Sequence, residues 1–261
     1  MERNAFIKSL IASVGVTQLT HVTAAFAALD EAEIGRQVFA QLRESGDLLF
    51  DSSYYEHLNE VGSVIAETAR PRYEYPIRFY IVRGESANAF SVPGGNIYVN
   101  EPLLKLAKNK DELAGVLAHE TGHMILHHVA KRMANGDKAN AVATVGSILA
   151  HVFGGPLGGA AADYGIGTAA AKQDANLSSH IEAQADEEGA RIVAATNVYN
   201  PYGMIWFFET MTATYGPGTT NYFRDHPLDA ARIADLQKEL TDNPQIFGKF
   251  HNTQQRDVAY W

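Results

Sequence analysis

The sequence predicts an α+β domain that is mostly helical and carries one small β-sheet. Two features indicate this class: helical stretches make up most of the chain, and strand-forming residues gather in one short region before residue 100. The chain has 261 residues, of which 46% are hydrophobic, so one domain can bury a sizeable core. The sequence contains no internal repeat, and we expect a single domain over residues 28–261.

The first 27 residues have the pattern of an export signal. Arg3 and Lys8 precede an apolar stretch around residues 10–19, and Ala25-Phe26-Ala27 has the small-x-small form of a cleavage site. Polar residues dilute the apolar stretch, so an amphipathic first helix of the domain is the alternative. Cleavage after Ala27 would start the mature chain at Ala28.

A small sheet is predicted ahead of residue 100. Residues 76–82 and 96–99 are rich in β-branched and aromatic side chains, and residues 93–95, Pro-Gly-Gly, are a turn signal. A strand over residues 88–92 at the edge of this sheet could hold an extended peptide by main-chain pairing. The candidate contacts are Asn88, Ala89 and Phe90. An ordinary hairpin explains the same pattern, and from the residues alone it is the simpler interpretation.

The next predicted element is a buried helix that starts near Asp111 and ends near Arg132. Asp111 and Glu112 suit its first turn, and Lys131 and Arg132 suit its last turn, because their charges complement the helix dipole. Between these ends, apolar residues occupy more than one face. Such a pattern is typical of a helix enclosed by the fold.

Residues 119–123 of this helix read His-Glu-Thr-Gly-His. Positions i and i+4 of a helix lie on one face, so His119 and His123 can reach the same ion. Glu120 would lie beside the ion, where a carboxylate can take a proton from an attacking water. Burying these side chains without a partner would be costly, and a zinc ion satisfies all three. Two separately hydrogen-bonded core histidines are the weaker alternative.

A catalytic zinc site needs a third protein ligand. A second helix, predicted over residues 177–196, places Glu182 and Asp186 one turn apart. If Glu182 binds the ion, Asp186 can accept a hydrogen bond from the far ring nitrogen of a ligand histidine. Spacing alone also allows a solvated acidic face or another ligand, and the competitors are Glu187, Glu188, Asp174 and His180. His127 lies two turns from His119, so it and His128 are expected to pack or to support the ligands.

Residues 139–171, between these two helices, contain one acid, Asp163, and no Lys or Arg. They could be mistaken for a membrane span, but seven glycines, Pro156 and His151 interrupt them. We expect a helical hairpin or a lid over the cleft, with shallow peripheral membrane contact as the alternative.

The last predicted helix runs from Leu228 to Leu240 and follows His226-Pro227. Proline is common at the first helical position, so this pair indicates a helix start. By itself it says nothing about catalysis.

The chain is acidic and has no cysteine. Its formal net charge is −9, and loss of residues 1–27 changes 21 basic and 30 acidic residues to 19 and 29, which gives −10. An acidic surface disfavours nucleic acid and anionic lipid as partners. The absence of cysteine excludes a disulfide and a lipid-modified N-terminal cysteine.

Four motifs together resemble those of the HtpX/BepA-like zinc metallopeptidases, a gluzincin family related to the CAAX prenyl proteases. They follow the family's order over about residues 30–240, and they are Asn88–Val99, His119–His123 with His128, Glu182–Asp186 with Gly189, and His226-Pro227 with Arg232. The resemblance implies a zinc ion bound by His119, His123 and Glu182, with Glu120 activating the water.

The resemblance also implies a place for His226 near the metal, supported by Arg232. There His226 would act as an electrophilic helper to the scissile carbonyl or as a displaceable fourth ligand.

The expected activity is zinc-dependent hydrolysis of unfolded or extended polypeptides in periplasmic protein quality control. Because the chain ends soon after the His226 helix, we do not expect the helical-repeat module of some similar enzymes. The broken 139–171 segment likewise separates it from the multi-span members. Two alternatives stay open: a zinc-bearing chaperone-like module that holds peptides without cutting them, and a peptidase kept silent by His226 or by the lid.

Overall fold

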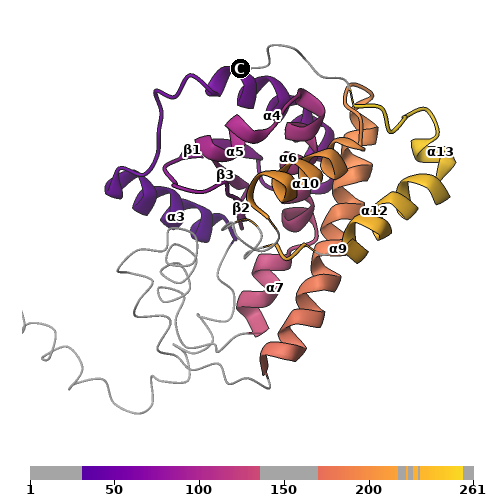
Figure 1. The fold of residues 1–261 in the computed structure, drawn as a ribbon. Coiled ribbons are helices and arrows are strands. Elements are labelled where there is room, and N and C mark those ends of the chain that lie inside the picture. Colours follow the sequence, from indigo (N-terminus) through magenta and orange to yellow (C-terminus); the bar gives the residue numbers. More distant parts are fainter. Residues whose placement is uncertain (1–30, 136–169, 217–221, 223–225, 229, 255–261) are drawn as a thin grey trace, which may run out of the picture.

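The computed structural model describes residues 31–135, 170–216, 222, 226–228 and 230–254 (Figure 1). Within these ranges it confirms the α+β class, because helices pack around one three-stranded sheet. The export signal predicted for residues 1–27 and nearly all of the lid predicted for residues 139–171 lie outside the described residues. None of the described helices combines the length and hydrophobicity that crossing a membrane requires.

The chain alternates helices with one strand cluster. The sheet strands are β1 (Arg78–Val82), β2 (Ala89–Val92) and β3 (Asn96–Asn100). The α-helices are α3 (Glu31–Ser45), α4 (Tyr55–Ala69), α5 (Glu101–Leu106), α6 (Lys110–Ile125), α7 (His128–Asn135), α9 (Ala170–Thr196), α10 (Gly203–Tyr215), α12 (Ala230–Asp242) and α13 (Pro244–Phe247). A short 3-10 helix, η1 (Arg70–Arg72), follows α4.

The sheet has the strand order β1-β3-β2, with β1 parallel and β2 antiparallel to β3. The turn between β2 and β3 contains Gly94 and Gly95 at φ 92° and 101°, a region that favours glycine. A Cβ on Gly94 would lie 2.5 Å from the carbonyl oxygen of Glu31, so α3 packs directly on this turn. The strand predicted over residues 88–92 forms as β2, and it lies at one edge of the described sheet.

Helix α6 lies at the centre of the fold and contacts α4, α9, α10 and β2 (Figure 1). Every residue from Glu112 to Met124 is buried, which confirms the prediction of an enclosed helix. The Asn109 side chain caps its first turn by accepting a hydrogen bond from the Glu112 N–H at 2.8 Å. The helix bearing residues 119–123 is thus held on several sides by the core.

The prediction of one continuous helix to Arg132 is wrong. Helix α6 ends at Ile125, and α7 begins at His128 after a break. His127 occupies the left-handed region at φ 54°, and its Nδ1 lies 2.6 Å from Glu31 Oε1. This contact with α3 supports a backbone conformation that ends a helix, although no glycine or proline marks the position.

Two other predicted helix starts also differ from the structure. Helix α9 begins at Ala170, seven residues earlier than residue 177. Helix α12 begins at Ala230, and Pro227 precedes it rather than occupying its first helical position. The Pro227 carbonyl accepts a hydrogen bond from Arg232 Nη1 at 3.0 Å. The His226-Pro227 segment is therefore anchored from α12 by a side chain.

Helices α6 and α9 approach each other through glycines. A Cβ on Gly189 would lie 2.9 Å from His119 N and 3.0 Å from His119 Cα. A Cβ on Gly122 would lie 2.9 Å from the carbonyl oxygen of Ala185. Because such contacts are too short for a side chain, these glycines set how near α9 lies to the histidines of α6.

Candidate metal centre

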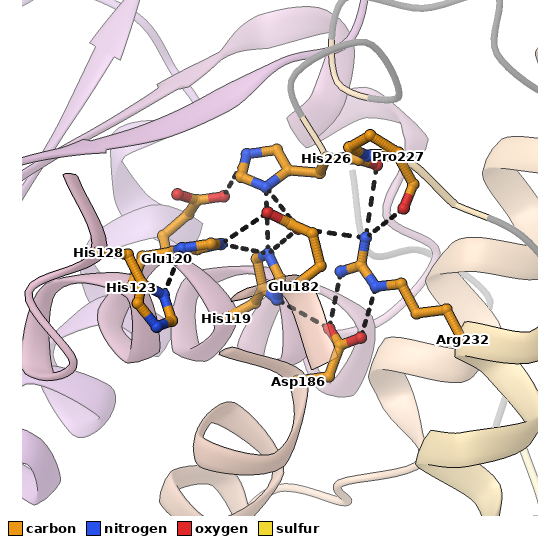
Figure 2. A network of polar contacts seen from close by, with 9 residues as sticks. All are labelled: His119, Glu120, His123, His128, Glu182, Asp186, His226, Pro227 and Arg232. Carbon is orange, nitrogen blue, oxygen red and sulfur yellow. Dashed lines mark hydrogen bonds and ion pairs between the residues drawn. The ribbon is translucent and has the colours of Figure 1, made fainter. Parts of the chain in front are cut away.

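Three predicted ligands converge between α6 and α9 (Figure 2). His119 Nε2 and His123 Nε2 lie 3.0 Å apart. Glu182 Oε2 lies 3.3 Å from His119 Nε2, and Glu182 Oε1 lies 3.5 Å from His123 Nε2. All three side chains are buried, so the structure brings a compact set of nitrogen and oxygen donors together inside the protein.

The spacing of these donors fits a zinc ion. A tetrahedral zinc ion with bonds of about 2.0–2.1 Å separates its ligand atoms by about 3.3 Å. The three observed separations, 3.0, 3.3 and 3.5 Å, scatter around that value. Two imidazoles and one carboxylate are also a donor set that zinc prefers.

His226 occupies a fourth corner of the cluster. Its Nδ1 lies 3.2 Å from His119 Nε2 and 3.0 Å from Glu182 Oε2. Ligand atoms of the four residues all lie within 4.8 Å of one another, and all four residues are buried. His226 thus stands where the fourth ligand of a tetrahedral ion would be.

Glu120 is fully buried beside the cluster and contributes no ligand atom to it. Its Oε1 lies 3.2 Å from His226 Nε2, so the His226 ring connects Glu120 with the donor cluster. Figure 2 shows the Glu120 carboxylate on the same side of α6 as the His226 ring. This position suits a base that acts next to a metal ion rather than on it.

A chain of polar contacts holds His119 from behind. Asp186 Oδ1 lies 2.8 Å from His119 Nδ1, the nitrogen that faces away from the cluster. Arg232 binds both oxygens of Asp186, through Nε at 2.5 Å and Nη2 at 2.8 Å. Arg232 Nη1 also lies 3.2 Å from Glu182 Oε2. The pair predicted as one turn apart on α9 therefore faces the site together (Figure 2).

The charged side chains around Glu182 and Asp186 favour the ionised form of these two carboxylates. Burial opposes ionisation of Glu182, but the charges of His226 and His123 hold its pKa well below the usual value. Burial likewise opposes ionisation of Asp186, and Arg232 lowers the pKa of that carboxyl. Burial alone would lower the pKa of His119, but hydrogen bonds to Asp186 and Glu182 outweigh it and raise the pKa to about 9. Protons on the histidines balance the negative charges of Glu182 and Asp186 when no metal is bound. A divalent cation would compete with these protons for the ring nitrogens.

Comparison with known families decides the assignment. The model of peptidase family M48 matches residues 55–240, which is more than half of the chain and includes all of the clustered residues. The chain belongs to peptidase family M48. Membership confirms the resemblance predicted from the motifs and makes the chain a metallopeptidase by family.

Several named relatives of this M48 chain are proteases. A beta-barrel assembly-enhancing protease of Escherichia coli K12 is 26% identical over 211 residues, which cover 79% of the chain and 43% of the relative. Metalloprotease LoiP of the same strain is 23% identical over 192 residues, covering 73% of the chain and 72% of LoiP. Mitochondrial metalloendopeptidase OMA1 of Schizosaccharomyces pombe is 44% identical over 55 residues, covering 21% and 16%. The chain spans less than half the length of the beta-barrel assembly-enhancing protease.

The competing ligands that the structure describes lie outside the donor cluster of this M48 domain. Glu187 is exposed and pairs with Arg191 at 3.0 Å, and Glu188 pairs with Arg72. His180 is exposed. His127 bonds to Glu31, away from the donor cluster. The Asp174 side chain lies outside the described residues.

His128 supports the site without joining the donor cluster. Its Nδ1 lies 3.0 Å from His123 Nδ1, on the side of His123 opposite the other donors. Burial lowers the pKa of His128 to about 4, so the ring is neutral at physiological pH. The sequence prediction left His128 as a packing or supporting residue, and the structure places it in contact with a candidate ligand.

One residue at the site was missed by the sequence interpretation. Tyr222 is fully buried, and its ring lies 4.7 Å from the His226 ring. Its position four residues before His226 was an available signal, because that spacing brings side chains together in a helical turn. Nothing in its residue type distinguishes it from other core tyrosines.

Replacing Arg232 with Lys is expected to weaken zinc binding about 10- to 100-fold, the cost typical of losing a residue that orients a ligand. Lys cannot form the paired hydrogen bonds that Arg232 makes with Asp186. Competition with a chromogenic chelator measures the affinity. Arg191→Lys, at a partly exposed arginine of α9 that also binds carboxylates, should change it less than about twofold. Equal losses in both variants would contradict the role of Arg232.

Replacing Gly189 with Ala is expected to weaken zinc binding and to lower the free energy of unfolding by about 1–3 kcal/mol. The new methyl group would lie 2.9 Å from His119 N, so α9 and its Glu182 must move away from α6. Urea titration and chelator competition measure the two effects. Ala195→Ser, which adds one heavy atom on the exposed side of α9, should leave both unchanged. An unaltered zinc affinity in Gly189→Ala would show that helix spacing does not set the site.

Proposed function

We propose that this M48 chain is a zinc-dependent endopeptidase that hydrolyses peptide bonds in extended or unfolded protein segments. The supporting observation is the buried donor set of His119, His123 and Glu182, with the Glu120 carboxylate beside it. His119, His123 and Glu182 would hold one zinc ion. A bound zinc ion supplies a Lewis acid that polarises a peptide carbonyl and lowers the pKa of water.

The side chains around this site have separate tasks in the proposed reaction. Glu120 takes a proton from the attacking water and passes it to the leaving amine. His226 would donate a hydrogen bond to the developing oxyanion, and the contact of its Nε2 with Glu120 Oε1 at 3.2 Å supports a position beside the base. Asp186 fixes the ring of His119, and Arg232 fixes Asp186.

Strand β2 is the proposed platform for the substrate. It is an edge strand of the described sheet and it packs on α6, the helix that carries His119 and Glu120. The Asn88 N–H donates to Asn100 Oδ1 and its carbonyl accepts from the Asn100 N–H, so Asn88 is already paired within the fold. Because main-chain groups alternate in direction along a strand, an extended peptide would pair with Ala89 among the predicted contacts. The Phe90 side chain stacks on Tyr98 at 5.0 Å within the core, so Phe90 offers no side-chain contact to a substrate. Main-chain pairing accepts many sequences, which suits unfolded substrates.

The relatives support a place for this activity. Proteases named for enhancing beta-barrel assembly match 79% of the chain, which favours unfolded envelope proteins as substrates and a periplasmic location. The predicted export signal at residues 1–27, followed by a peptidase domain over 28–261, agrees with that location. The acidic charge of −9 disfavours nucleic acid as a partner. A lid formed by residues 139–171, with shallow peripheral membrane contact as the alternative, is a further part of this proposal.

Removing the metal should abolish cleavage by the purified chain. Mass spectrometry of an unfolded substrate such as reduced casein measures cleavage and maps the bonds cut. We expect activity to disappear with a zinc chelator and to return with stoichiometric zinc. Magnesium should not restore it, because magnesium prefers six oxygen ligands. Cleavage that persists in metal-free protein would refute the proposal.

A resting state closed by His226 is favoured by a separate observation. His226 Nδ1 lies 3.0 and 3.2 Å from two donor atoms, in the corner that a substrate or water needs. His226→Ala separates two roles for this residue. Turnover rises if His226 mainly closes the site, and it falls if His226 mainly stabilises the oxyanion.

A further inference from the structure

The Tyr222 ring packs against the His226 ring in a tilted arrangement. The two ring centroids are 4.7 Å apart with an interplanar angle of 33°. On its other side the Tyr222 ring meets Phe207 edge-on, at 6.0 Å and 83°. Both Tyr222 and Phe207 are fully buried. Tyr222 therefore contacts both the core helix α10 and the imidazole of His226.

Backbone hydrogen bonds join Tyr222 to two parts of the site. The His226 N–H donates to the Tyr222 carbonyl at 2.7 Å, and the Tyr222 N–H donates to the Ala87 carbonyl at 3.3 Å. Ala87 lies two residues before β2, the proposed substrate strand. Tyr222 therefore connects the His226 segment with the start of that strand.

The remaining contacts of the His226 ring are polar or involve other candidate ligands. His119 and His123 meet it at centroid distances of 5.0 and 5.2 Å, and Glu120 and Glu182 approach its nitrogens. These residues are themselves candidate ligands or the candidate base, so their positions depend on the metal site. Among the described aromatic contacts of His226, Tyr222 is the one that comes from the apolar core.

The Tyr222 ring stays neutral in this setting. Burial, followed by the negative charge of Glu120, raises the pKa of its hydroxyl well above the usual value. A neutral phenol ring can stack on an imidazole without adding a charge to the site.

We propose that Tyr222 is a positioning residue that holds the His226 ring with Nδ1 directed at the ligand atoms of His119 and Glu182. The inference rests on the proposed zinc site and adds a residue that acts through His226. Without the Tyr222 ring, His226 would lose its described ring contact with the apolar core and would be free to turn out of the fourth corner.

Cobalt(II) in place of zinc provides a test that does not depend on catalysis. High-spin Co(II) absorbs visible light more strongly in four-coordinate tetrahedral sites than in sites of higher coordination number. Titration of the metal-free chain therefore reports both the affinity and the fourth ligand. We expect Tyr222→Leu to bind Co(II) about tenfold more weakly, with absorption reduced toward that of His226→Ala.

Three comparisons make this test specific. Tyr222→Phe keeps the ring that packs against His226 and should match the unmodified chain within about twofold. Phe207→Leu alters the same core region without touching His226, and it should keep the full Co(II) absorption. In a His226→Ala background, Tyr222→Leu should change Co(II) affinity less than about twofold, because the partner through which it acts is gone.

The outcomes distinguish this inference from the proposed function. Failure of the unmodified chain to bind Co(II) or zinc refutes the metal site and with it the role of Tyr222. Normal binding by the unmodified chain combined with full absorption in Tyr222→Leu overturns the role of Tyr222 alone. An equal loss in Phe207→Leu, or the same tenfold loss in the His226→Ala background, overturns it as well. If circular dichroism shows that Tyr222→Leu is unfolded, Tyr222→Phe decides: reduced absorption there contradicts positioning by the ring.

Discussion

Glu120→Gln is expected to retain one zinc ion per chain and to lower kcat/KM for an unfolded protein substrate about 10²- to 10⁴-fold. Glutamine has the same shape as glutamate but cannot accept a proton from water. Glu120 contributes no atom to the ligand cluster, so zinc binding should survive its replacement. Zinc analysis by mass spectrometry and a cleavage assay on the same sample measure both quantities.

The control for this variant is Glu209→Gln, an equivalent change at an exposed position of α10. It should leave zinc content and cleavage unchanged. Undiminished cleavage by folded, zinc-loaded Glu120→Gln would defeat the assignment of Glu120 as the base. The same variant tests the chaperone-like alternative, because a module that only holds peptides would behave identically before and after the change.

Glu182→Ala is expected to lose both zinc and cleavage. It removes the carboxylate that lies 3.3 Å from His119 Nε2 and 3.5 Å from His123 Nε2, and it leaves only the two histidines of α6 and the displaceable His226. Loss of the metal removes several kcal/mol of transition-state stabilisation, which corresponds to more than about 10³-fold in rate. Zinc content after dialysis and the rate of casein cleavage measure the effect.

Glu187→Ala is the matched control, because Glu187 lies on the same helix, is exposed and pairs with Arg191. It should bind zinc and cut substrate like the unmodified chain. If Glu182→Ala keeps its zinc while Glu187→Ala loses it, the third ligand has been assigned to the wrong carboxylate.

Local spacing was sufficient to predict much of the site. His119 and His123 share one face of a helix at i and i+4, and Glu182 and Asp186 do the same on another helix, because helical geometry alone fixes those relations. The small sheet was predictable for the same reason: β-branched residues flank a Pro-Gly-Gly turn. Which acid of α9 faces the histidines depended on how two helices pack, and spacing left that question open.

Contacts between distant segments explain the errors. The break at His127 depends on Glu31, which is 96 residues away, so no nearby residue signals it. The anchoring of Pro227 by Arg232 spans only five residues, but Arg232 is itself held by Asp186, 46 residues away, and the sequence pattern instead suggested a helix start. Tyr222 gains its role only from the ring beside it. Residue types report local preference, and such tertiary contacts override it.

The most direct test of the account is a crystal structure of the zinc-loaded chain, with anomalous diffraction measured at the zinc absorption edge. The account predicts one strong anomalous peak about 2.0–2.2 Å from His119 Nε2, His123 Nε2 and a Glu182 carboxylate oxygen. A peak bound by other side chains, or no peak after incubation with zinc, would contradict the claim that these three residues form the metal site.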